Sequence, residues 1–253
     1  QKLDPELTYG PMRIAAYNLK SGERKILGPT DNMYCDVSDA LIAYIGRDME
    51  SSTEKYWLRI FSLPGMGTVG TWETGMGRKA QVSGYNVVWE EFVSKPPAKL
   101  PGDNTATLGE QMAWQGDVQL LKLPSAQFTQ VKYINVTQDT IDSNWPQIDG
   151  DFVIWVDYSD PRTWPDKKPV LRVLNITTGQ KFSIPTDAVQ IQPEIDENRV
   201  VWINDWAKSR DTFDGWNSTL YLYNLSTGQK TLLKTLGPWN SRLAVFGDRV
   251  FWE

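Results

Sequence analysis

The sequence contains no histidine and a single cysteine, Cys35. Without histidine, neither a Ser-His-Asp nor a Cys-His catalytic arrangement can form, and the commonest protein ligand of zinc and copper is missing. Cys35 has no disulfide partner within the chain. It falls in an expected inner strand, where we expect a buried and unreactive thiol. Any chemistry therefore has to use carboxylates, tyrosine, lysine or arginine.

Long runs of one kind of residue are missing as well. No apolar stretch approaches the length of about 18 residues that a membrane span needs, so we expect no membrane insertion. The formal charge is −5 and no basic run is longer than Lys167-Lys168, so we expect no nucleic-acid partner. What the chain has in excess is tryptophan, with 12 residues in 253.

A hairpin that ends in an aromatic residue recurs along the chain. The five final aromatic residues, here called anchors, are Tyr44, Trp89, Trp155, Trp202 and Trp252. Two and seven residues before each anchor stands a β-branched aliphatic residue: Ile42, Val87, Val153, Val200, Val250 and Val37, Val82, Ile148, Ile195, Val245. We expect these side chains on the inner faces of paired strands, packed between neighbouring repeats. Tight turns of Gly, Asn and Asp, which tolerate positive φ, separate the two positions.

A second hairpin recurs with the first. One aligned position just before its turn holds Leu19, Leu63, Leu123, Ile176 and Leu225. Periods of about 40 to 50 residues with four strands apiece, here called A to D, are typical of β-propeller blades. No stretch has a sustained helical period of apolar residues, so we expect an all-β fold with almost no helix.

The two ends of the chain complement each other. Residues 12–27 supply strands C and D of a blade, and residues 243–253 supply strands A and B. We therefore expect a five-bladed β-propeller of four-stranded antiparallel blades, whose ring closes when the N-terminal strands C and D pair with the C-terminal strands A and B. Residues 1–253 would then form one domain, alone or within a longer exported protein. The alternative is a fragment of a longer propeller.

Two segments resemble the repeats of TolB-like propellers. Residues 146–155, Pro-Gln-Ile-Asp-Gly-Asp-Phe-Val-Ile-Trp, are similar to the inner hairpin P-x-I-S-P-D-G-x-x-I-A-F, and residues 220–225, Leu-Tyr-Leu-Tyr-Asn-Leu, to the outer strand D-I-Y-V-M-D-L. Members of that family are mostly exported proteins, either periplasmic assembly factors or cell-surface propellers of archaea and bacteria. The long B–C loops here favour the second type. The resemblance thus implies an extracellular or cell-surface location, with the periplasm as second choice.

The predicted B–C loops carry the candidate binding residues. They span 46–55, 91–116, 158–168 and 206–218. Aromatic rings on loops above a rigid scaffold suit recognition, so a binding face is expected there. Its predicted residues are Trp164, Trp206, Trp216, Trp114, Tyr158, Asp160, Asp211 and Asp214. The alternative is that the indoles fold back over the blades and belong to the core.

The same loops are rich in aspartate, and oxygen ligands of this kind suit calcium. The residues concerned are Asp157, Asp160, Asp205, Asp211 and Asp214. No EF-hand or Asp-rich repeat pattern is present, and solvated loop charge commonly explains such residues. We therefore expect no cofactor and no metal, with a structural calcium as the alternative.

Four Asn-x-Ser/Thr sequons occur, at Asn135, Asn175, Asn217 and Asn224. Asn175 and Asn224 lie in the repeated turn, which itself requires these residue types. Only Asn135 and Asn217 are independent indications of glycosylation in an exported protein.

The function we expect is a non-catalytic propeller that acts as a protein-binding or scaffold module through its B–C face. A carbohydrate-binding lectin is one alternative, because exposed tryptophan beside Asp and Asn suits sugars. A glycosidase-type propeller is another, and it needs two carboxylates at the central funnel. The positions eight residues before the anchors are Asp36, Gln81, Gln147, Glu194 and Ala244. Asp36 and Glu194 are the acidic candidates among them.

Overall fold

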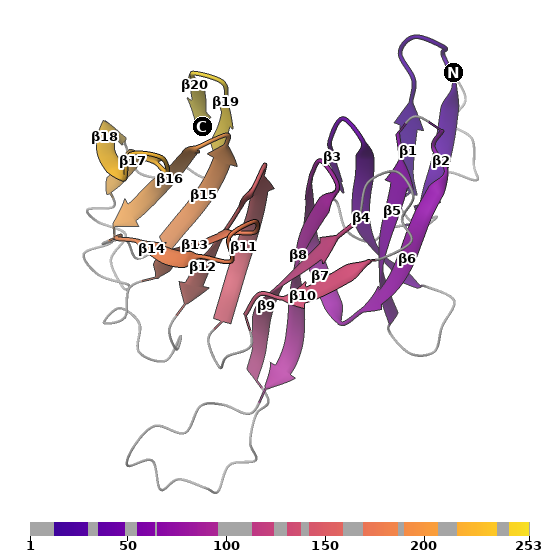
Figure 1. The fold of residues 1–253 in the computed structure, drawn as a ribbon, viewed down its shortest axis with the longest axis horizontal. Coiled ribbons are helices and arrows are strands. Elements are labelled where there is room, and N and C mark those ends of the chain that lie inside the picture. The colour runs from indigo at the N-terminus through magenta and orange to yellow at the C-terminus, as the bar shows by residue number, and fades with distance from the viewer. Residues whose placement is uncertain are drawn as a thin grey trace, which may run out of the picture.

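The computed structural model describes residues 13–29, 35–48, 55–63, 65–95, 113–123, 131–137, 142–158, 169–186, 190–206, 217–236 and 243–252. Within these ranges every regular element is a β-strand (Figure 1). The strands form four four-stranded sheets and two two-stranded sheets, and all paired strands are antiparallel. The predicted all-β class is confirmed.

The four complete sheets each contain strands A to D as neighbours in chain order. The first consists of β3 (Cys35–Val37), β4 (Leu41–Asp48), β5 (Lys55–Ser62) and β6 (Thr68–Thr74). The second consists of β7 (Met76–Ser83), β8 (Asn86–Lys95), β9 (Ala113–Lys122) and β10 (Lys132–Asn135). The third consists of β11 (Asp142–Asp149), β12 (Phe152–Tyr158), β13 (Val170–Asn175) and β14 (Lys181–Ile184). The fourth consists of β15 (Gln190–Asp196), β16 (Arg199–Trp206), β17 (Asn217–Asn224) and β18 (Gln229–Leu236).

The two remaining sheets are the hairpins at the ends of the described chain. One is β1 (Arg13–Tyr17) with β2 (Arg24–Pro29), and the other is β19 (Leu243–Phe246) with β20 (Arg249–Trp252). They do not pair with each other, and Figure 1 shows them apart. Within the described residues the structure therefore shows no closed ring. We call its four-stranded sheets complete blades and its two terminal hairpins half-blades. Each half-blade is held by packing one face on its own neighbouring sheet, which does not require the other half-blade.

The tight turns have the backbone conformation that the sequence predicts. The first turn residue between strands A and B has positive φ in four repeats, with values of 53°, 52°, 54° and 57° at Gly84, Gly150, Glu197 and Gly247. In the turns between C and D, the side-chain oxygen of Asn18, Asn175 or Asn224 accepts hydrogen bonds from the backbone N–H groups two and three residues later. Both half-blades thus carry the local geometry of complete blades.

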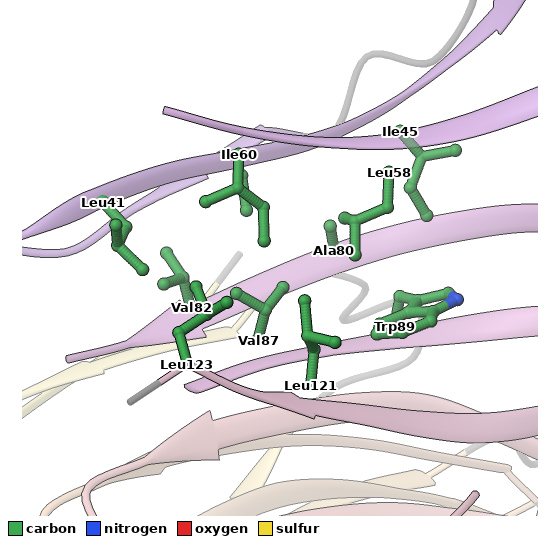
Figure 2. Close-up of a cluster of buried hydrophobic side chains, with 11 residues drawn as sticks. Leu41, Ile45, Leu58, Ile60, Ala80, Val82, Val87, Trp89, Leu121 and Leu123 are labelled. Atoms are coloured by element: carbon green, nitrogen blue, oxygen red, sulfur yellow. The ribbon is translucent and has the colours of Figure 1, made fainter. Parts of the chain in front are cut away.

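Apolar side chains fill the space between neighbouring sheets. Figure 2 shows the cluster between the β3–β6 and β7–β10 sheets, where Leu41, Ile45 and Leu58 face Val87 and Trp89. Equivalent clusters lie between the next sheets along the chain. The anchors of the four complete sheets, Tyr44, Trp89, Trp155 and Trp202, are at most 3% exposed, as the repeat pattern predicts.

The predicted burial is not found at the two ends of the series of blades. Trp252 is 42% exposed and Val37 is 60% exposed. Cys35 is exposed as well, so the predicted burial of its thiol is wrong, although its placement in a strand is right. The paired partner of Val37 is Ile42, which packs toward β1 and β2. Val37 therefore faces the half-blade at the N-terminal end, where only two strands are present to cover it.

Candidate functional site

The B and C strands of the complete sheets are joined at one end, and the A–B and C–D turns lie at the other end of the same strands. Asp48 pairs with Lys55, Lys95 with Ala113, and Trp206 with Asn217. The segments between these pairs are 49–54, 96–112 and 207–216, and the third sheet has 159–169 at the same place. All but residue 169 lie outside the described residues.

Most of the predicted binding residues belong to those segments. Trp164, Trp216, Asp160, Asp211 and Asp214 lie outside the described residues. For Trp114, the second residue of β9, and Trp206, the last residue of β16, the structure describes the backbone alone. Their roles in binding stay predictions.

Tyr158 is the one predicted binding residue whose side chain is described. It is half-buried and packs against the cluster between the β11–β14 and β15–β18 sheets. Its hydroxyl donates a hydrogen bond to the carbonyl oxygen of Ile191 over 3.5 Å. Burial raises the pKa of Tyr158 to about 12. The ring of Tyr158 thus packs between two sheets, and its role in binding stays a prediction.

The structure brings the two acidic inner-strand positions into one electrostatic cluster. The Asp36 carboxylate on β3 accepts a hydrogen bond from the backbone N–H of Val82 over 2.7 Å. The Glu194 carboxylate on β15 accepts one from the Gln147 side chain on β11 over 3.4 Å. Burial and the nearby charge of Asp36 raise the pKa of Glu194 to about 7. The charge of Lys79 acts in the opposite direction. Burial likewise raises the pKa of Asp36.

Two β-bulges add residues that the sequence pattern does not predict. Lys79 on β7 and Trp145 on β11 have φ values of 50° and 59°, a conformation that is unfavourable for residues other than glycine. Each lies at a register shift, ten residues before its anchor. Bulges redirect side chains, and here the Lys79 ammonium lies over the indole ring of Trp145.

Glu90 completes this group from the neighbouring strand β8. Its buried carboxylate accepts a hydrogen bond from the backbone N–H of Trp145 over 3.4 Å. Burial lowers the pKa of Lys79 to about 7, an effect that the charge of Glu90 opposes. Burial raises the pKa of Glu90, and Lys79 opposes that shift in turn. We call the whole set the inner-strand cluster; its members are Asp36, Lys79, Glu90, Trp145, Gln147 and Glu194.

A repeat alignment extended by two positions would have found the bulges. The aligned positions given above stop eight residues before each anchor, whereas Lys79 and Trp145 lie ten residues before theirs. A lysine and a tryptophan at the same position of neighbouring repeats suggest a contact between repeats. Glu90 directly follows the anchor Trp89 and carries no such signal.

Asp157 forms a second buried polar group, between β11, β12 and β13. One carboxylate oxygen accepts hydrogen bonds from the Trp155 indole at 2.7 Å and the Ser143 hydroxyl at 2.8 Å. The other accepts one from Arg172 at 2.7 Å. In the next repeat the indole of Trp202 donates to Asn204 in the same way. These bonds hold the anchor tryptophan in its orientation.

The residues considered for calcium are only partly described. Asp157 uses both carboxylate oxygens for the bonds above, and Asp160, Asp211 and Asp214 lie outside the described residues. Within the described ranges, no group of three or more Asp, Glu, Cys or His residues is arranged to hold a metal ion. The expected absence of a cofactor stays a prediction, with a structural calcium in the loops as its alternative.

The glycosylation sequons differ in their surroundings. Asn135 lies in β10 with a buried side-chain oxygen, and the hydroxyl of Thr137 accepts a hydrogen bond from the backbone of Val118. Asn217 begins β17, and the structure describes its backbone alone. Glycosylation at Asn135 and Asn217 stays a prediction. The part of the chain that the structure describes also holds no helix able to span a membrane.

No model of a known protein family matches the chain, and no curated protein matches it. Solved structures do. Pyrococcus horikoshii acylaminoacyl peptidase is 11% identical, and the match covers 95% of this chain and 38% of that one with a TM-score of 0.58. The β-propeller domain of the trilobed protease from Pyrococcus furiosus is 8% identical over 79% of this chain and 56% of that one, with a TM-score of 0.52. The tricorn protease is 9% identical over 95% of this chain and 25% of that one, with a TM-score of 0.51.

At these identities the likeness concerns the fold. It shows that the chain has a β-propeller fold, as the repeats predict. The chain spans between a quarter and just over half of the length of those three proteins, with 25% and 56% as the extremes.

Proposed function

We propose that this chain is a five-bladed β-propeller of the cell-surface type, closed by its two half-blades, which binds a partner protein through its B–C face. The observation that carries the binding proposal is the placement of the longest connections. Segments 96–112, 159–169 and 207–216 all join a B strand to a C strand, whereas the A–B connections are two- or three-residue turns. Long loops on one end of a rigid scaffold are where propellers and other repeat folds place recognition.

The composition of these connections suits protein recognition. They contain Trp164 and Trp216, and Trp206 and Trp114 lie on the strands directly beside them. Interfaces draw most of their energy from a few residues, among which tryptophan, tyrosine and arginine are enriched. The A–B turns of Gly, Asp and Asn offer little area, against the roughly 800 Å² per partner that a standard interface buries.

The closed ring is supported first by where apolar side chains remain exposed. Of the twelve large apolar residues exposed in the described part of the chain, nine lie on the half-blades, β3 or β18. They are Tyr17, Leu19, Ile26, Val37, Leu232, Leu233, Phe246, Phe251 and Trp252. Monomeric proteins rarely leave such a set uncovered. If the two half-blades paired, they would cover the exposed apolar side chains at both ends of the series of blades.

The register of the complete blades supports closure too. In each of them the anchor pairs with the C-strand residue four positions before the aligned Leu or Ile, for example Trp202 with Tyr221. The backbone N–H of the aligned residue also bonds to a carbonyl of the A–B turn in all four complete blades. The same register in the fifth blade pairs Trp252 with Ala15 and places Leu19 against Asp248. Both hairpins already have the turns that this register needs.

The test of the binding face separates binding from stability. The purified chain is used to isolate partners from a cell-surface extract, and a candidate identified by mass spectrometry is then purified and its Kd measured. We expect Trp164→Ala and Trp216→Ala to weaken binding by roughly 2 kcal/mol or more while the melting temperature barely changes. The half-buried Trp72 on β6 is the matched control, because Trp72→Ala should lower the melting temperature and leave Kd unchanged. Loss of stability with normal binding in the two loop variants would refute the proposed face.

A carbohydrate-active propeller is the second candidate, and the inner-strand cluster favours it. Asp36 and Glu194 share one cluster, and the pKa of Glu194 is about 7, as a catalytic acid near neutral pH requires. The chain is incubated with a panel of oligosaccharides, and new reducing ends are measured. Hydrolysis that Glu194→Gln abolishes would establish this candidate. A glycan array of the same protein tests the lectin alternative.

A further inference from the structure

Two lysines form the same hydrogen bond across neighbouring blade interfaces. The ammonium of Lys181, the first residue of β14, donates to the carbonyl oxygen of Val136 over 2.7 Å. The ammonium of Lys230 on β18 donates to the carbonyl oxygen of Pro185 over 3.1 Å. Each acceptor belongs to the residue that directly follows strand D of the preceding blade, β10 or β14. We call this contact the interblade bond.

Arg24 occupies the same repeat position in the N-terminal half-blade. It follows the aligned Leu19 by five residues, which is the spacing of Lys181 and Lys230 in their own blades. In all three hairpins the paired residue on strand C stands two positions before the aligned Leu or Ile. The glycine two residues before each cation has a φ of 74°, 76° or 71°. The backbone therefore directs the side chain of Arg24 as it directs those of the two lysines.

The open ring leaves Arg24 without a preceding blade. Its hairpin is the first in the described chain, and its side chain is exposed. In the closed ring β1 and β2 are strands C and D of the fifth blade, so the preceding blade is the β15–β18 sheet. The end of β18 then takes the place that the ends of β10 and β14 take for the two lysines.

We propose that Arg24 fastens the closed ring through an interblade bond: its guanidinium donates to a backbone carbonyl at the end of β18 when the half-blades pair. This inference rests on the closed ring proposed above. A hydrogen bond from a charged donor is stronger than one between neutral groups. The contact joins outer strands, away from the pairing of β20 with β1, so it holds the closed ring at a second place.

The other interfaces differ at this repeat position. The β3–β6 sheet has Thr68 there, a short side chain without charge. At that interface Lys25 of the half-blade donates to the carbonyl oxygen of Met66 instead. The equivalent residue of the β7–β10 sheet, Phe128, lies outside the described residues. Both complete blades that have a cation at this position thus form the interblade bond.

The anchor of the fifth blade offers Arg24 a second contact. In the fourth blade the Lys230 ammonium also lies 5.4 Å from the ring centre of the anchor Trp202. Closure places Trp252 at the equivalent position, and a guanidinium over an indole is a favourable cation–π contact. The Lys234 ammonium already lies 5.4 Å from the ring centre of Trp252. Because two cations at one ring repel each other, the main contact of Arg24 is the hydrogen bond.

The experiment measures ring closure and unfolding in the full chain. Donor and acceptor dyes are attached at Lys20→Cys and Asp248→Cys, two exposed positions in the turns of the two half-blades. The background is Cys35→Ser, which removes the exposed native thiol. Energy transfer and far-ultraviolet circular dichroism are followed together during urea denaturation. Dichroism without urea confirms that each variant is folded.

We expect high energy transfer without urea in the otherwise native chain. Arg24→Met should lower the urea midpoint of energy transfer, by a shift similar to that which Lys230→Met causes in the dichroism midpoint. Arg24→Lys should keep the native midpoint, because lysine forms this bond in two other blades. Lys132→Met is the matched control and should leave both midpoints unchanged, since Lys132 is exposed on β10 and far along the chain from both half-blades.

Three results would overturn the inference, and they are distinguishable. Low energy transfer without urea would show that the ring does not close, which refutes the proposed ring as well. High transfer with the same midpoint in Arg24→Met and Lys132→Met would leave the closed ring in place and refute the role of Arg24. A midpoint in Arg24→Lys as low as in Arg24→Met would show that a cation at this position is not what holds the ring.

Discussion

At the scale of single residues, Asp157 is a buried side chain on which three hydrogen bonds converge. Its carboxylate is buried and serves Trp155, Ser143 and Arg172 at once. Replacing it by alanine leaves an indole N–H and a hydroxyl without their acceptor inside the sheet, and it separates Arg172 from its only described carboxylate partner. A buried polar group that loses its partner costs about 1 to 3 kcal/mol.

We therefore predict that Asp157→Ala lowers the free energy of unfolding by about 2 to 4 kcal/mol. Urea denaturation followed by tryptophan fluorescence measures the change. Asp157→Asn, which keeps an acceptor for the indole as Asn204 does for Trp202, should lose less. The exposed Asp39 provides the control, since Asp39→Ala should stay within about 0.5 kcal/mol. A loss of that small size for Asp157→Ala would contradict the structural role.

Some residues could be placed from the sequence, and others could not. The buried anchors Trp89, Trp155 and Trp202 follow from a period that strand geometry imposes on every repeat. The contact between Lys79 and Trp145 does not follow, because it depends on two bulges that move both side chains off the regular alternation. The predicted binding residues on the B–C segments have no such period, so composition was the only guide to them.

At the scale of elements, the A–B turns offer a comparison within one chain. Gly150 and Glu197 occupy the same turn position with φ values of 52° and 54°. Glycine adopts this conformation without a steric penalty, whereas a residue with a Cβ is disfavoured there by roughly 1 kcal/mol. A Cβ added at Gly150 would meet nothing within 4 Å, so backbone conformation alone decides the effect of a substitution.

We predict that Gly150→Ala lowers the free energy of unfolding by roughly 1 kcal/mol and that Glu197→Gly raises it by a similar amount. The side chain of Glu197 is exposed and forms an ion pair with Arg199, which contributes little at the surface. Glu197→Gln, which keeps the backbone conformation, separates the two effects and should be nearly neutral. Equal melting temperatures for all three variants would show that these turns are not under the expected strain.

At the scale of the whole molecule, the order of blades follows from the repeats, while ring closure depends on a contact between the two ends of the chain. Every complete blade has a neighbour on both sides, and its anchors are buried as predicted. The errors concern Cys35 and Val37 on β3 and Trp252 on β20, which lie where the series of blades ends. A repeat pattern predicts that an inner face is covered, but it does not contain the information about which segment covers the first and last copies.

Phe251 distinguishes the open ring from the closed one. It is 56% exposed, and its paired residue is Ala244, on the side of the half-blade that faces away from the β15–β18 sheet. If the ring stays open, Phe251→Ala removes a largely solvated ring and changes the free energy of unfolding by less than about 0.5 kcal/mol. If the ring closes, the side chain is buried against the β3–β6 sheet, and the same change costs about 3 to 5 kcal/mol. We expect the larger loss for Phe251→Ala, measured by urea denaturation at pH 5.5. The control is Val131→Ala, because Val131 is exposed and lies far along the chain from both half-blades. This control should leave the free energy of unfolding nearly unchanged.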